Sequence, residues 1–82
     1  MQEVILMING ETVEMNVSRV FRGKNPVTKQ YSVNIMDDES GKQVRLFCKD
    51  QQNQEEADAL VQKIREDKIA DLTGYLAVWN RE

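Results

Sequence analysis

Side chains capable of catalysis are few in this sequence. It contains no histidine, so the commonest general base near neutral pH and the commonest metal ligand are both missing. Its single cysteine, Cys48, follows Val44 and Leu46 at two-residue intervals. This spacing places all three on one face of a strand and predicts a core thiol. Although Lys49 would favour the thiolate, no histidine is present to activate it as a nucleophile.

Two other sequence patterns resemble functional motifs but lack residues that those motifs require. The acidic residues 37–39 could begin a calcium loop, but Cys48 stands where the bidentate glutamate belongs. Gly23-Lys24 lacks both the earlier glycine and the following Ser or Thr of a phosphate-binding loop. The sequence therefore predicts a protein that is not an enzyme and that has no metal site and no cofactor.

The strongest candidate for binding lies on a strand predicted over residues 43–49. If Val44, Leu46 and Cys48 face the core, Phe47 faces away from it between Arg45 and Lys49. An aromatic ring between two cations suits base stacking with phosphate contact, and it also suits a protein interface. The competing interpretation is that Phe47 belongs to a second apolar surface. The candidate binding residues are Arg45, Phe47, Lys49, Met36, Arg22 and Lys24.

The first half of the chain predicts the strands that position these residues. The apolar run 4–8 predicts a short strand buried on both faces, and Asn9-Gly10 predicts a tight hairpin turn. Residues 12–22 then alternate between apolar and polar types, with a slip of one residue near Ser18. We interpret this slip as a bulge in one long strand.

The middle of the chain predicts a second hairpin. Residues 23–29 contain glycine, Asn-Pro and lysines, and predict a loop. Residues 30–37 predict the third strand, and 38–42 a polar loop in which Gly41 adopts a positive φ. This hairpin places Met36 beside the candidate strand 43–49.

A helix is predicted over residues 54–68, with Asn53 as its N-cap. Four apolar residues recur at helical spacing and predict the buried stripe: Ala57, Leu60, Val61 and Ile64. After the helix, residues 75–80 contain Val, Trp and Tyr, which favours a last strand over a second short helix.

These elements predict an α+β fold: an antiparallel sheet of about five strands with one helix packed on one face. The fully apolar strand 4–8 should be central, with the strand 75–80 returning beside it. The expected strand order is 43–49, 30–37, 12–22, 4–8 and 75–80. The alternative is a small, partly closed β-barrel with a helix.

Composition limits the function further. With 82 residues the chain predicts a single domain, and a net charge of −3 argues weakly against general affinity for nucleic acid. Its longest apolar run is too short for a signal peptide or a membrane span, which predicts a cytoplasmic location and no membrane partner.

Two functions from different classes fit this description. The first is a small regulatory, inhibitory or accessory protein that binds a protein partner, or a second copy of itself, through an exposed sheet face or an edge strand. Its size and lack of cofactor motifs are typical of stand-alone proteins that phages and mobile elements encode. The alternative is a single-stranded nucleic-acid binder that uses Phe47 and its basic neighbours.

Overall fold

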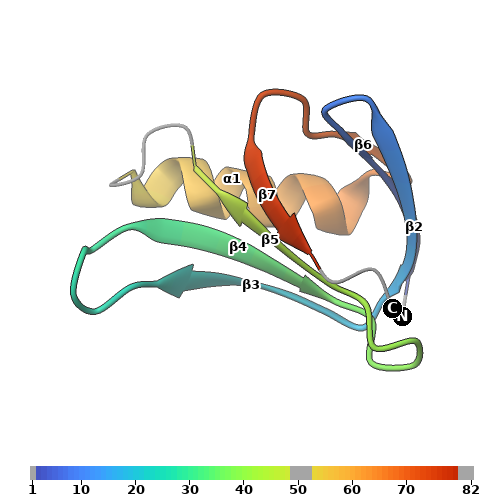
Figure 1. The fold of residues 1–82 in the computed structure, drawn as a ribbon, viewed down its shortest axis with the longest axis horizontal. Helices are drawn as coiled ribbons and strands as arrows, with labels where there is room; N and C mark the ends of the chain where they lie inside the picture. Colours follow the sequence, from blue (N-terminus) through green and yellow to red (C-terminus); the bar gives the residue numbers. More distant parts are fainter. Residues whose placement is uncertain (1, 49–52, 80–82) are drawn as a thin grey trace.

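The computed structural model describes residues 2–48 and 53–79. Their strands form two sheets, one of three strands in the order β2-β1-β6 and one of four in the order β3-β4-β5-β7 (Figure 1). The elements in chain order are β1 (Gln2–Ile8), β2 (Glu11–Val17), β3 (Arg19–Lys24), β4 (Tyr31–Met36), β5 (Gln43–Phe47), α1 (Gln54–Glu66), β6 (Ile69–Asp71) and β7 (Leu76–Trp79). The predicted α+β class with one helix is confirmed.

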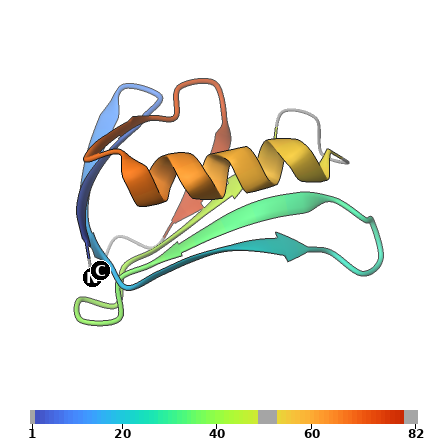
Figure 2. The same ribbon diagram turned by 180° about the vertical axis from the view of Figure 1, so that it is seen from behind.

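The helix α1 covers one face of the four-stranded sheet. It packs on β3 and β4, while the three-stranded sheet stands at its C-terminal end (Figure 2). All three parts contribute to one apolar core, for example through Leu6 of β1, Leu46 of β5 and Leu60 of α1. The expected single five-stranded sheet is wrong, as is its strand order, and the described strands do not close into a barrel.

The helix begins as the sequence predicts. The Asn53 side-chain oxygen accepts a hydrogen bond from the Glu56 backbone N–H at 3.2 Å, which satisfies one of the free donors of the first turn. The predicted apolar stripe is buried. The helix ends at Glu66 rather than at residue 68, because the backbone of Asp67 is extended and leads directly into β6.

The long strand predicted over residues 12–22 is interrupted at Ser18. β2 belongs to the three-stranded sheet and β3 to the four-stranded sheet, so Ser18 is a corner between sheets rather than a bulge within one. The Ser18 N–H donates to the Met36 carbonyl at 2.8 Å, and the Ser18 hydroxyl oxygen accepts from the Asp38 N–H at 3.0 Å. These bonds attach the corner to the loop after β4.

The Asp37 side chain stabilises this corner through hydrogen bonds with the backbone. Its buried carboxylate accepts hydrogen bonds from three backbone N–H groups, those of Asn16, Glu39 and Ser40, each at 3.1 Å. These bonds, that from Ser40 foremost, lower the pKa of Asp37 below its usual 3.8, against the opposing effect of desolvation. Asp37, the last residue of the predicted third strand, therefore stabilises the corner between the two sheets.

The strand β1 is central in its sheet, as predicted, but it is not buried on both faces. Its side chains alternate, and Met7 is 43% exposed. The neighbour that follows the helix is β6, which runs parallel to β1 and was not predicted. The predicted last strand does form, as β7, but it pairs with β5 instead of β1.

Candidate functional site

The face of the four-stranded sheet that points away from α1 carries the candidate site. In Figure 1 the helix lies behind this sheet and no described element lies in front of it. Strand alternation and register assign eleven residues to this face, which we call the outer face, and none of them is buried. They are Arg19, Phe21, Gly23, Ser32, Asn34, Met36, Gln43, Arg45, Phe47, Leu76 and Val78.

Apolar side chains occupy much of the outer face. Phe21 is 42% exposed, Leu76 66% and Val78 59%. Phe47 and Met36 are half-buried. Phe21, Met36, Phe47 and Val78 line a common hollow of about 630 Å³. Contiguous exposed apolar groups of this kind mark interaction sites more often than scattered single ones do.

Arg45 lies in the middle of this apolar surface. In the strand register it stands between Asn34 of β4 and Val78 of β7. Its Nε donates a hydrogen bond to the Asn34 side-chain oxygen at 3.0 Å. An added Cβ on Gly23 would lie 2.8 Å from Asn34 Nδ2. The glycine therefore leaves the space in which the Asn34 amide lies.

Among its described residues, the outer face has no carboxylate. Its two charged residues are Arg19 and Arg45. Arg19 forms an exposed ion pair with Asp38 of the neighbouring loop, at 3.2 Å, and such pairs contribute little to stability. Arg45 makes no ion pair within the part of the chain that the structure describes. The outer face is thus apolar and cationic, in a protein whose net charge is −3.

The predicted binding residues separate into two groups. Met36, Arg45 and Phe47 lie together on the outer face, as expected. Arg22 and Lys24 point to the opposite side. Arg22 pairs with Asp58 of α1 at 2.8 Å, and both cations lie over the Tyr31 ring, at 5.7 and 5.2 Å from its centroid. Lys49 falls outside the described residues.

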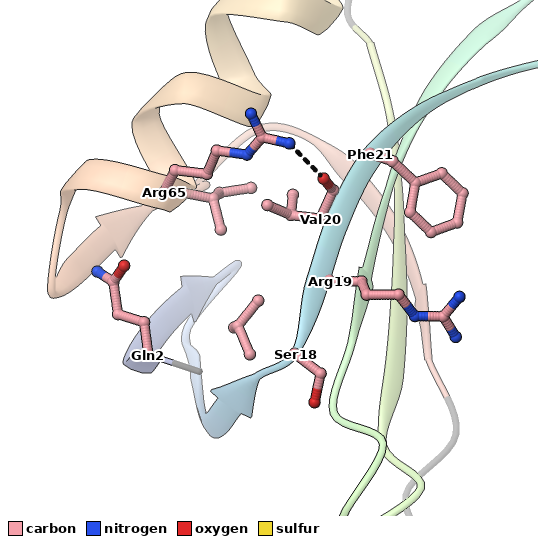
Figure 3. A pocket seen from close by; sticks show the side chains of 8 residues that line it. Gln2, Ser18, Arg19, Val20, Phe21 and Arg65 are labelled. Atoms are coloured by element: carbon pink, nitrogen blue, oxygen red, sulfur yellow. Dashed lines mark hydrogen bonds between the residues drawn. The ribbon is translucent and has the colours of Figure 1, made fainter.

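Sequence reasoning missed three apolar members of this face: Phe21, Leu76 and Val78. Figure 3 shows the Phe21 and Arg19 side chains projecting to the side opposite Val20, which is buried. The signal was the slip near Ser18. A shift of one residue moves the core positions from odd to even numbers, which places Val20 in the core and Phe21 on the exterior.

A second hollow, of about 530 Å³, lies at the seam between the two sheets. Arg65 of α1 reaches across it and donates from Nη2 to the Val20 carbonyl at 3.2 Å (Figure 3). Val20 belongs to β3, the edge strand of the four-stranded sheet. This bond satisfies a carbonyl at a sheet edge and ties the helix to it, which is a structural role.

The residues considered for catalysis and metal binding do not form a site in the described structure. Cys48 is buried with the core. Within residues 2–48 and 53–79, no three His, Cys, Asp or Glu side chains gather as a metal site would require. No helix in the same ranges is long and apolar enough to cross a membrane.

Comparison with known proteins found no matching family model, no similar curated protein and no similar solved structure. The function is therefore inferred from the chemistry of the outer face.

Proposed function

We propose that this chain is a non-catalytic protein-interaction module that binds a protein partner through the outer face. The observation that carries the proposal is the open sheet face on which Phe21, Met36 and Phe47 surround Arg45. Aromatic residues, Met and Arg are enriched at protein interfaces, and Asp and Glu are depleted there.

The energetic argument concerns what a partner would gain. Covering Phe21, Leu76 and Val78 removes apolar surface from water, at about 25 cal/mol per Å² of area. The backbone at these positions is already ordered in strands, so little backbone entropy is lost on binding. A pre-formed sheet face therefore supports binding without a change in fold.

Affinity capture with matched variants tests this proposal. The double variant Leu76→Ser/Val78→Ser makes the outer face polar at two exposed positions. The control is Val27→Ser, which alters an apolar residue that is 86% exposed in the loop between β3 and β4. Specific partners that the wild type captures from cells of the encoding organism should be lost with the double variant and retained with the control. Identical partners for both variants would contradict the proposal.

Single-stranded nucleic acid remains the second candidate, because Phe21 and Phe47 present two rings beside Arg45. Against it, Arg22 and Lys24 face α1, and Arg19 is paired with Asp38. Few cations are therefore left for phosphates on this face. Trp79 fluorescence, titrated with a single-stranded oligonucleotide at low salt, should not respond. Salt-sensitive binding that is lost in Phe47→Ala would favour the nucleic-acid function instead.

A further inference from the structure

We infer that the partner bound by the outer face presents a carboxylate flanked by apolar side chains, and that Arg45 receives this carboxylate. The inference rests on the proposed function and names the chemistry of the partner. It follows from three features: the orientation of the Arg45 side chain, the lack of a carboxylate on the outer face, and the like charges that two outer faces would bring together.

The orientation of Arg45 leaves the end of its guanidinium available. Asn34 takes the Nε–H, at 3.0 Å, and no other bond of Arg45 is present within the described ranges 2–48 and 53–79. The two Nη groups thus keep their donors, and their planar arrangement matches the two oxygens of a carboxylate. Because Asn34 already fixes the side chain, less rotamer entropy is lost when the carboxylate binds.

The surroundings of Arg45 require a charged partner. A partner that covers Val78 and Phe47 also removes water from Arg45, which lines the same hollow. A desolvated cation without a counter-charge weakens an interface, whereas one with a carboxylate is compensated. No side chain assigned to the outer face within residues 2–48 and 53–79 supplies that carboxylate, so we assign it to the partner.

A symmetric pair of this chain does not meet that requirement. Two outer faces brought together would bury Arg19 and Arg45 of both copies without a carboxylate from either face. Like charges in an interface are unfavourable. A second copy could supply carboxylates only through an unlike face, such as the exposed side of β2 with Glu14, and such head-to-tail contacts build rings or open filaments rather than a closed pair. The occupant we propose is a different protein, with an acidic and apolar segment.

Selection from a random peptide library against the whole chain tests the inference. Enriched peptides should contain Asp or Glu next to apolar residues. Synthetic copies should bind about 10- to 100-fold more weakly to Arg45→Glu, which is the range for losing hydrogen bonds to a charged group. Arg45→Lys should lose roughly 3- to 10-fold, because an ammonium cannot donate two parallel bonds.

The matched control is Lys68→Glu, which makes the same change in net charge at an exposed position before β6. It should leave peptide affinity unchanged, and thermal melts should show that both Glu variants fold. Replacing the peptide carboxylate with an amide should reproduce the loss seen with Arg45→Glu. Acidic peptides that bind Arg45→Glu as tightly as the wild type would overturn the inference.

The remaining outcomes separate this inference from the proposed function. Enriched peptides that lack carboxylates but fail to bind Leu76→Ser/Val78→Ser would overturn the inference and leave the proposed function intact. Peptides that bind this double variant normally would overturn both. Glu14 lies on the exposed side of β2, in the three-stranded sheet. Oligomers of the wild-type chain that disappear in Glu14→Lys would assign the outer face to a second copy and also overturn the inference.

Discussion

The two sheets have similar apolar inner faces, but the charges on their outward faces have opposite signs. On the inner side, Leu6 of β1 and Leu46 of β5 are both fully buried in the same core. The side of the three-stranded sheet that faces away from the core, called here the acidic face, carries three carboxylates and no cation. Its members are Glu3, Ile5, Met7, Thr12, Glu14, Asn16, Ile69 and Asp71. The outer face of the other sheet carries two arginines and no carboxylate.

This difference shows what burial determines and what it leaves open. The inner positions of both sheets must be apolar because they share one core. The exposed positions are not constrained in this way, yet each face keeps charges of a single sign around apolar residues such as Ile69 and Leu76. An acidic partner is attracted by the outer face and repelled by the acidic face, which would select one docking side.

The largest expected effect is the difference in stability between substitutions on the inner and outer sides of β5. Leu46→Ala should lower the free energy of unfolding by about 2–5 kcal/mol, because Leu46 is fully buried. Phe47→Ala should cost only about 1 kcal/mol, because its half-buried ring packs on one side of the sheet. Urea denaturation of both variants measures the difference. Equal losses would mean that Phe47 belongs to the core.

The next effect compares the two outer surfaces by charge reversal. Arg45→Glu should weaken an acidic peptide by about 10- to 100-fold, as argued above. Glu14→Lys makes the reciprocal change at an exposed position of the acidic face and should alter the same affinity by less than about twofold. Fluorescence anisotropy at two salt concentrations measures both. An equal response to both variants would contradict the assignment of binding to one face.

The corner that joins the two sheets should respond to acid. The pKa of Asp37 is lowered in the fold, so its carboxylate stabilises the protein above the unfolded value of 3.8. This contribution is lost as the pH falls through the lowered folded value. Asp37→Asn should be less stable than the wild type near neutral pH, with a smaller loss than Leu46→Ala, and its stability should depend less on pH below about 4. Urea midpoints measured across that range check the prediction, and parallel curves for the two proteins would contradict it.

The smallest effect concerns the support of Arg45. Gly23→Ala places a methyl group 2.8 Å from Asn34 Nδ2 and 3.2 Å from Ser32 Oγ, and only the ends of these two side chains have to move. Stability should change by less than about 0.5 kcal/mol. Affinity for acidic peptides should fall by a few-fold, since Asn34 would no longer orient Arg45. Ser32→Ala, at a neighbouring outer position, is the control that should leave affinity unchanged.

The parts of the fold that the sequence predicts are those decided locally. The Asn53 cap and its apolar stripe predict α1, and Asn9-Gly10 predicts a turn in which both residues have positive φ, 47° and 88°. Alternation in β5 places Leu46 inside and Phe47 outside, as the structure confirms. For the candidate site, this local pattern was enough to bring Met36, Arg45 and Phe47 together.

The parts that were missed depend on contacts between distant segments. A bulge within one sheet and a corner between two sheets leave the same one-residue slip near Ser18. Only the bonds to Met36 and Asp38 distinguish them. β6 has three residues, too few for a periodic pattern, and it forms by pairing with β1 across the whole chain. The directions of Arg22 and Lys24 likewise depend on where α1 and Tyr31 lie.

Because Cys48 is buried, the rate at which its thiol reacts with a reagent reports how often the structure opens. This residue is the sole thiol of the chain, it is 2% exposed, and it follows Phe47 directly. An alkylating reagent can reach the sulfur only when the structure around Cys48 opens locally or the whole domain unfolds. The labelling rate therefore measures the free energy of that opening without any engineered probe. A ligand seated over Phe47 would slow the labelling in proportion to its occupancy.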